Sequence, residues 1–216
     1  MVMDPKQNPS DTLNEIRTLM ERSTRFVSLS GLSGVAAGIF ALLGAAMVYW
    51  YLDLLPFEVN RIYYQESLTA QKWGMNYRTF FLLDAFFVIL GAAIACTYFT
   101  ARKAKKKGQK IGINDALTRR IFINLFVPLL MGGIFCLALF YHGYIGLLAP
   151  STLIFYGLAL LNAGKLTFDD IRYLGYSELV LGSIALFKLG YGLELWAIGF
   201  GVLHIFYGIL MYRKYD

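Results

Sequence analysis

Six long apolar stretches, separated by polar segments, constrain this chain of 216 residues more than any other feature of its sequence. Each stretch is close to the roughly 20 residues that a helix needs to cross a bilayer. The chain is 57% apolar and 16% charged, whereas soluble domains carry about 25% charged residues. This composition excludes a soluble globular enzyme, a nucleic-acid-binding module and a disordered chain.

We therefore predict an all-α integral membrane protein with six transmembrane helices, arranged as three consecutive hairpins in a single domain, residues 26–216. Residues 1–25 are polar and lack the apolar stretch of a cleaved signal peptide. Within this tail, residues 12–25 predict an amphipathic helix at the membrane surface or on a partner. The expected spans are residues 26–51, 79–101, 121–141, 144–163, 168–189 and 193–212.

The distribution of basic residues predicts the orientation of these spans. Sixteen of the 20 lysines and arginines lie in the N-terminal tail, after span two, between spans four and five, and at the C-terminus. The other four lie in the segments on the opposite side. Lysine and arginine favour cytoplasmic loops. We therefore expect a protein of the bacterial inner membrane with both termini in the cytoplasm.

A basic run after span two has two interpretations. It fixes the topology, because such a run is expected on the cytoplasmic side, or it also binds anionic lipid headgroups. The first interpretation is the simpler one. The basic residues of this run are Arg102, Lys103, Lys105, Lys106, Lys107 and Lys110.

Five ionisable residues fall inside the expected spans, where each is costly in hydrocarbon and normally faces protein or water. If spans five and six fold back on each other about Tyr191, residues whose numbers add up to the same total share a depth. Lys188 then meets Glu194, and Glu178 meets His204. These pairs either hold the hairpin in register or form a polar relay for protons or a solute. The candidate relay consists of Asp84, Glu178, Lys188, Glu194 and His204.

Span one carries a stripe of small residues that includes the G-x-x-x-G pair Gly34 and Gly38. Such a stripe allows two helix backbones to approach closely. We expect it to pack within the chain, against Gly91, Ala92 and Ala95 of span two. Homo-oligomerisation through the same face is the alternative, and a second membrane protein is a further candidate partner.

The chain contains no zinc-protease, C-x-x-C, nucleophile-elbow, phosphate-loop or dinucleotide motif. With only two histidines, a histidine-based metal site would need carboxylates from several helices. We therefore expect no catalytic residues, no metal and no cofactor.

Two stretches carry a likeness to a known group of proteins. FYGLALLNAGKLTFDDIRYLGYSELVLG (155–182) and YGLELWAIGFGVLHIFYGILMYRKY (191–215) resemble small six-span inner-membrane proteins of bacteria. The resemblance implies the six-helix membrane fold and transfers no functional residue, because the group has no assigned function.

Three functional hypotheses follow from these features. The leading one is a non-enzymatic membrane protein that acts through helix and partner contacts, as an accessory, assembly or stress-response component. The second is a small proton-linked channel or transporter that uses the polar relay between spans two, five and six. The third is an intramembrane enzyme acting on lipids. The first two differ in whether Glu178 and His204 line a wet cavity or a dry interface.

The charge distribution makes a testable prediction about topology. Tags at residues 2 and 216 should both report a cytoplasmic location, because the basic segments stay inside. A cysteine introduced as Gln71→Cys should react with an impermeant thiol reagent added from outside. Labelling only from the cytoplasmic side would contradict the charge argument.

Overall fold

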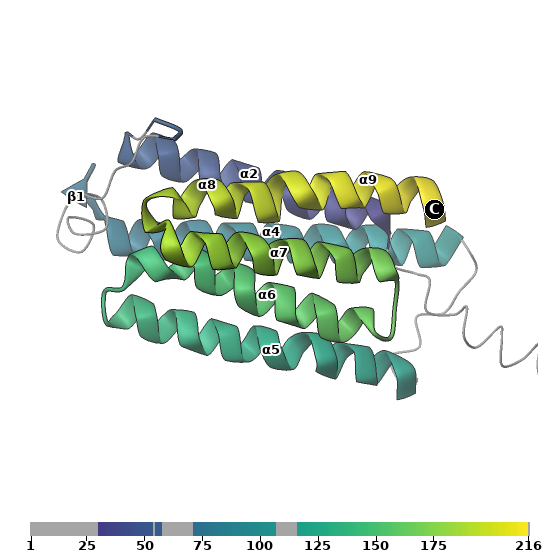
Figure 1. Ribbon diagram of the computed structural model, residues 1–216. Helices are drawn as coiled ribbons and strands as arrows, with labels where there is room; N and C mark the ends of the chain where they lie inside the picture. The colour runs from purple at the N-terminus through teal and green to yellow at the C-terminus, as the bar shows by residue number, and fades with distance from the viewer. Residues whose placement is uncertain (1–29, 54, 58–70, 107–115, 216) are drawn as a thin grey trace, which may run out of the picture.

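The computed structural model describes residues 30–53, 55–57, 71–106 and 116–215, and within them the chain is almost entirely helical. Figure 1 shows an elongated bundle in which the helices lie side by side along one common direction. The expected amphipathic helix at residues 12–25 lies outside the described residues, as do Lys107 and Lys110.

The helices follow the apolar stretches of the sequence. The last four elements continue one another and form a single rod, residues 189–215. The elements are α2 (Gly31–Leu52), α4 (Tyr77–Lys106), α5 (Ala116–Tyr141), the 3₁₀ turn η1 (Ile145–Leu147), α6 (Leu148–Gly164), α7 (Asp169–Phe187), the 3₁₀ turn η2 (Leu189–Tyr191), α8 (Gly192–Trp196), the π-helical segment η3 (Ala197–Leu203) and α9 (His204–Tyr215).

Five of these helices are long and apolar enough to cross a membrane, as in a multi-pass membrane protein. They are the helices over Gly31–Leu52, Tyr77–Lys106, Thr118–Tyr141, Ile145–Gly164 and Leu189–Tyr215. The remaining long helix, α7, has 19 residues and carries Asp169, Asp170, Arg172 and Glu178. It carries too many charged residues to qualify as a span by length and composition alone, so the sixth span stays a prediction.

Helix α4 ends later than expected. It runs to Lys106 instead of ending near Ala101, and its last turn contains Lys103, Lys105 and Lys106. Lysine is a good helix former, and positive charge near a helix C-terminus interacts favourably with the helix dipole. The first part of the basic run, which was expected to follow span two, is therefore the end of the helix.

A short hairpin lies between α2 and α4, although the predicted all-α fold contains no strand. Strands β1 (Gln71–Lys72) and β2 (Met75–Asn76) pair antiparallel, with Lys72 opposite Met75. The connecting residues Trp73 and Gly74 both have positive φ, 53° and 76°, as a two-residue type I′ turn requires. Strands of two residues are too short to give a sequence pattern, which is why this hairpin was missed.

The glycine stripe of α2 packs within the chain, but against a different helix from the one expected. A Cβ on Gly34 would lie 3.2 Å from the Cα of Gly208, and one on Gly38 would lie 2.7 Å from the carbonyl oxygen of Gly201. The G-x-x-x-G pair of the stripe therefore contacts η3 and α9, whereas the prediction placed it against Gly91, Ala92 and Ala95 of α4. Helix α4 packs on another part of α2, where Gly91 accommodates the ring of Phe40.

A second glycine contact joins α6 to α7. A Cβ on Gly157 would lie 2.8 Å from the carbonyl oxygen of Gly175, and a Cβ on Gly175 would lie 3.0 Å from that of Gly157. Only glycine allows two helix backbones to come this close. Helices α6 and α7 are thereby held together as closely as α2 and the last rod.

These contacts place α2, α6, α7 and the last rod at the centre and leave α4 and α5 at the periphery. Helix α4 packs on α2, and α5 packs on α6. Both keep long apolar faces exposed, among them Phe86 and Ile89 of α4 and Leu130 and Leu137 of α5, as expected for faces in contact with lipid. The buried cluster of Leu160, Ile171, Leu174 and Met211 joins α6, α7 and α9.

The glycine contact between α2 and α9 predicts the effect of one added methyl group. Gly208→Ala should lower the free energy of unfolding by about 1–3 kcal/mol, because overpacking forces neighbouring atoms apart. Its Cβ would lie 2.6 Å from the amide nitrogen of Val35 and 2.8 Å from the carbonyl oxygen of Gly31. Thermal unfolding in detergent measures the effect.

Gly133→Ala in α5 is the matched control, because a Cβ there would meet no atom within 4 Å. Alanine is the better helix former, so this variant should be neutral or slightly more stable. Equal melting temperatures for Gly208→Ala and Gly133→Ala would contradict the close contact.

Candidate functional site

The structure brings Glu178 of α7 and His204 of α9 together in the centre of the bundle. The Nδ1 atom of His204 lies 3.5 Å from Oε1 of Glu178. The two residues are 0% and 5% exposed. The contact that the fold-back about Tyr191 predicts is therefore confirmed, and it lies in an interface closed to the surface.

His204 has a hydrogen-bond partner on each side of its ring. Its Nδ1 lies 3.0 Å from the carbonyl oxygen of Gly199, and its Nε2 lies 2.8 Å from the hydroxyl of Tyr156. A carbonyl oxygen only accepts, so Nδ1 carries the hydrogen and donates it to Gly199. In the neutral ring Nε2 then accepts from the Tyr156 hydroxyl. A neutral imidazole is thus fully satisfied here.

The π-helical segment η3 supplies the carbonyl group that orients His204. An α-helix pairs each amide with the carbonyl four residues earlier, whereas a π-helix pairs it with the fifth. His204 bonds through its side chain to Gly199, five residues earlier. Short π segments inside α-helices are frequent at functional sites. Here the segment begins one residue after Trp196 and ends at the residue before His204.

Gly199 also makes room for the carboxyl group of Glu178. A Cβ on Gly199 would lie 2.5 Å from Oε2 of Glu178 and 2.6 Å from Cδ2 of Leu153. Any larger residue would displace the carboxyl group. The absence of a side chain at position 199 therefore allows Glu178 to reach His204.

Glu178 has an unusual environment. Both of its carboxyl oxygens are buried, and neither has a hydrogen-bond partner among the described residues. An unsatisfied buried polar group costs about 1–3 kcal/mol, and more when it is charged. An ionised Glu178 therefore needs a positive charge beside it, and His204 is the side chain placed to provide one. The pair is therefore stable in two states that each hold one proton. Either Glu178 is protonated and His204 is neutral, or Glu178 is ionised and His204 is protonated.

Aromatic rings enclose the pair. The ring of Phe200 stacks on that of His204 with centroids 5.7 Å apart, and the ring of Tyr156 lies 5.2 Å from His204. Trp196 extends the same stack, 5.1 Å from Phe200. This apolar shell lowers the local dielectric constant and strengthens the interaction between Glu178 and His204.

No hydrogen bond or ion pair within the described residues joins Asp84 to this pair. Asp84 is half-buried on α4 and its side chain lies against Gly44 of α2, where a Cβ would be 3.4 Å from Oδ2. Its Oδ1 is buried without a hydrogen-bond partner in the described part of the chain. Asp84 is therefore a separate polar group in the α2–α4 interface.

The expected pair of Lys188 and Glu194 does not form. Lys188 is exposed where α7 ends, and its backbone leaves the helical conformation there, with φ −122° and ψ 57°. Glu194 is buried, and its Oε1 accepts a hydrogen bond of 3.1 Å from the backbone amide of Phe57. The reason is that the 3₁₀ turn η2 interrupts the simple fold-back that the prediction assumed. Glu194 instead holds the segment that follows α2.

The basic run divides into exposed and buried residues. Arg102, Lys105 and Lys106 are exposed at the end of α4, where they can reach a membrane surface. Lys103 is only 7% exposed, so it cannot reach a membrane surface as the other three can. Contact with anionic lipid stays a prediction for the exposed three.

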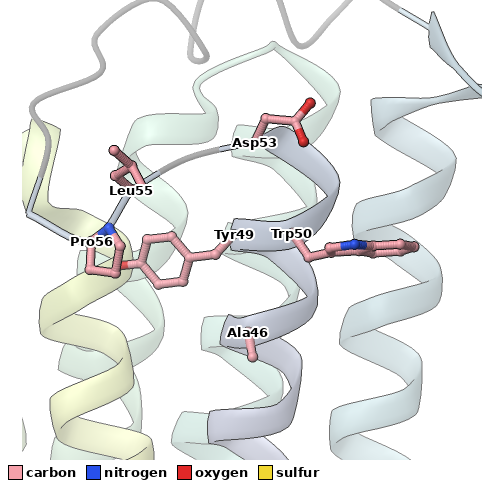
Figure 2. Close-up of a pocket in the computed structure, with 6 residues that line it drawn as sticks. All are labelled: Ala46, Tyr49, Trp50, Asp53, Leu55 and Pro56. Atoms are coloured by element: carbon pink, nitrogen blue, oxygen red, sulfur yellow. The ribbon is translucent and has the colours of Figure 1, made fainter.

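A shallow, open groove of about 600 Å³ lies at the C-terminal end of α2, and Figure 2 shows the residues that line it. The ring of Tyr49 points toward Pro56, whereas Trp50 points to the opposite side of α2 (Figure 2). The ionisable residue of its lining, Asp53, already forms an ion pair with Lys72. The lining residues are Ala46, Tyr49, Trp50, Asp53, Leu55 and Pro56. None of the candidate relay residues belongs to this groove, so it carries no part of the site.

Sequence reasoning missed two members of the site, Tyr156 and Gly199. Tyr156 lies in span four, whose sequence gives no sign that this tyrosine faces span six. Gly199 is one of several glycines in an apolar stretch, and the π-helical segment that exposes its carbonyl has no pattern of its own. No cluster of three or more histidine, cysteine, aspartate or glutamate side chains in the described residues could hold a metal ion.

No protein-family model matches this chain, and no curated protein and no solved structure shows significant similarity to it. The likeness to small six-span inner-membrane proteins stays an expectation based on residues 155–182 and 191–215.

The contact between Glu178 and His204 predicts a coupled effect on stability. Glu178→Gln and His204→Gln should each destabilise the protein, whereas the double variant should lose less than the sum of the two. We expect a coupling of about 0.5–3 kcal/mol, as for residues in direct contact. Thermal unfolding of the four proteins in detergent measures this coupling.

The cycle of Glu194→Gln with His204→Gln is the matched control. Glu194 is also a buried glutamate, but it bonds to the Phe57 amide, so these two effects should add. Additive effects in both cycles would refute an energetic contact between Glu178 and His204.

Proposed function

We propose that this protein is a small proton-linked channel or transporter of the bacterial inner membrane and that Glu178 and His204 form its proton-binding site. The observation that carries the proposal is the carboxyl group of Glu178. It is fully buried, has no hydrogen-bond donor among the described residues and lies 3.5 Å from a histidine nitrogen. Ionisable groups deep in a membrane bundle commonly mark ion and proton pathways.

A purely structural role accounts poorly for this carboxyl group. A side chain that only holds two helices in register is expected to have its hydrogen bonds satisfied, since each missing bond costs stability. The closed glycine contacts already set the register of α6 against α7 and of α2 against α9. Neither contact joins α7 to α9, which is the pair of helices that Glu178 and His204 connect. The argument for proton binding therefore rests on the unsatisfied oxygens of Glu178, which suit a group that gains and loses a proton.

The proposal includes six spans, with α7 as the fifth. Its 19 residues extend about 28 Å at 1.5 Å per residue, close to the thickness of the hydrocarbon core. The most polar side chain in its middle, Glu178, is shielded by α6 and α9. Its charged first turn, with Asp169 and Asp170, lies at the same end of the bundle as the C-terminus of α9 (Figure 1). The proposal puts this end in the cytoplasm, and the distribution of lysine and arginine supports that orientation.

A second function, the accessory or assembly role, is favoured by the complete enclosure of the pair, because a dry interface at Glu178 and His204 is the feature expected of that role and a wet cavity the feature expected of a transporter. Glu178 and His204 lie in a dry interface, and α4 and α5 expose long apolar faces. These features suit an accessory or assembly component that works through helix contacts with another membrane protein. In that case the pair acts only within the folded bundle, and no proton crosses the membrane.

Proteoliposomes distinguish the two functions. The purified protein, reconstituted with a pH-sensitive dye inside the vesicles, should carry protons when a potassium gradient with valinomycin drives them inward. Glu178→Gln should reduce the flux to the level of empty vesicles, because glutamine cannot take up a proton. Glu194→Gln, which removes a buried carboxyl group outside the pair, should retain it.

Flux in the wild-type protein that does not exceed that of empty vesicles would contradict proton transport and favour the accessory role. Equal flux in Glu178→Gln and the wild type would show that protons move without this site.

A further inference from the structure

The glycine contacts divide the centre of the bundle into two groups of helices that meet between α7 and α9. In the first group, α7 lies against α6 at Gly175 and again at Gly182, where a Cβ would lie 2.7 Å from Cγ1 of Ile154. In the second group, α2 lies against the last rod at Gly34 and Gly38. Helix α7 packs far more extensively on α6 than on α9. Helices α7 and α9 therefore meet at the boundary between two groups that are each held together by close backbone contacts.

The chain itself ties this boundary at one end. The turn η2 joins α7 directly to the last rod, so the two cannot separate there. The turn contains Gly190 and is followed by Gly192, and small residues are common at hinges. At the opposite end, where α7 begins and α9 ends (Figure 1), the link between the two helices depends on side chains.

Four side chains make this link, and we call them the terminal clasp. Oδ2 of Asp170 in α7 accepts two hydrogen bonds from α9, one of 3.0 Å from Nζ of Lys214 and one of 2.7 Å from the hydroxyl of Tyr215. The ring of Tyr215 also lies 4.2 Å from that of Phe168, the residue that precedes α7. The terminal clasp thus joins the first turn of α7 to the last turn of α9.

An apolar layer lies between the terminal clasp and the buried pair. Ile171 and Leu174 of α7 and Met211 of α9 belong to one cluster, and each is 7–8% exposed. Leu174 is four residues before Glu178, about one helical turn, and Asp170 is about one turn further away. The terminal clasp and this layer together close the approach to Glu178 along α7 and α9.

We infer that the terminal clasp is the cytoplasmic gate of the buried pair. When Asp170 releases Lys214 and Tyr215, the ends of α7 and α9 separate about the turn η2, the apolar layer opens and water from the cytoplasm reaches Glu178. The inference rests on the proposed function, which makes the pair a proton-binding site and puts this end of the bundle in the cytoplasm. It assigns the inner of the two gates that transport across a membrane requires. The closed gate keeps the one-proton pair dry.

The reactivity of a cysteine in the apolar layer tests the gate. Leu174→Cys is introduced into the full chain after Cys96 and Cys136 have been replaced by alanine, and inside-out membrane vesicles are treated with an impermeant maleimide. Asp170→Ala should raise the labelling rate of this cysteine by about tenfold or more, because two hydrogen bonds to a carboxylate are lost. An unchanged rate would show that the terminal clasp does not control access, and the inference would be wrong.

Asp169→Ala is the matched control. Asp169 also lies in the first turn of α7, but it pairs with Arg172 of the same helix, 3.1 Å away. Its loss removes the same charge without touching α9, so the labelling rate should stay at that of the parent protein. An equal rise in Asp169→Ala and Asp170→Ala would overturn the inference.

A second cysteine separates opening of the gate from general loosening of the fold. Ala185 is fully buried near the end of α7 that η2 ties to the rod. Ala185→Cys should therefore stay unreactive in Asp170→Ala. If both cysteines become reactive, the terminal clasp only stabilises the bundle and the inference fails. If Leu174→Cys alone becomes reactive while the wild type carries no protons in proteoliposomes, the clasp controls opening and the proposed function fails.

A distance measurement tests the same movement without a buried cysteine. Tyr173 of α7 and Tyr212 of α9 are both exposed, so Tyr173→Cys and Tyr212→Cys can carry spin labels. Pulsed electron paramagnetic resonance should show an added population at longer distance in Asp170→Ala and none in Asp169→Ala. Identical distance distributions in the two variants would contradict a gate at this end of the bundle.

Discussion

The close approach of helix backbones at glycine is the constraint on which the rest of this structure depends. Gly157 and Gly175 hold α6 against α7, while Gly34 and Gly38 hold α2 against Gly208 and Gly201 of the last rod. Lipid tails are as apolar as leucine, so helices in a membrane gain little by burying apolar surface and depend on such packing. With both contacts made, α7 and α9 lie where Glu178 can meet His204.

The same close packing determines what the central pair can do. Because the interface excludes water, an ionised Glu178 would cost several kcal/mol unless His204 carried a compensating charge. The protonation states of the two residues are therefore linked, and the pair titrates as a unit. Phe200 and Tyr156 strengthen this linkage by replacing water around the imidazole. A dry interface and a proton-binding function are thus compatible, provided that the proton has a path of hydrogen bonds to follow.

Sequence reasoning located the helices well and the contacts between them less well. Apolar runs of about 20 residues directly report helices that lie in lipid, and the depth of a residue follows from counting along a helix. This counting was sufficient to pair Glu178 with His204. It failed for Lys188 and Glu194, since a single 3₁₀ turn near the end of α7 changes where the side chains point. The partner helix of the α2 stripe could not be predicted either. A glycine pattern indicates that another helix backbone approaches closely, but it does not indicate which helix that is.

The π-helical segment η3 contacts both the buried pair and the first helix, α2. Its glycines face in two directions: Gly199 lies against Glu178 and Leu153, whereas Gly201 lies against Leu42 of α2. The segment is therefore packed between α7 and α2, and at these two positions its backbone meets the side chains of the neighbouring helices directly. The Glu178 carboxyl group thus lies against the backbone at Gly199, only two residues from the contact with α2. The surroundings of the buried pair and the packing of the first helix on the last therefore both depend on residues of one short segment.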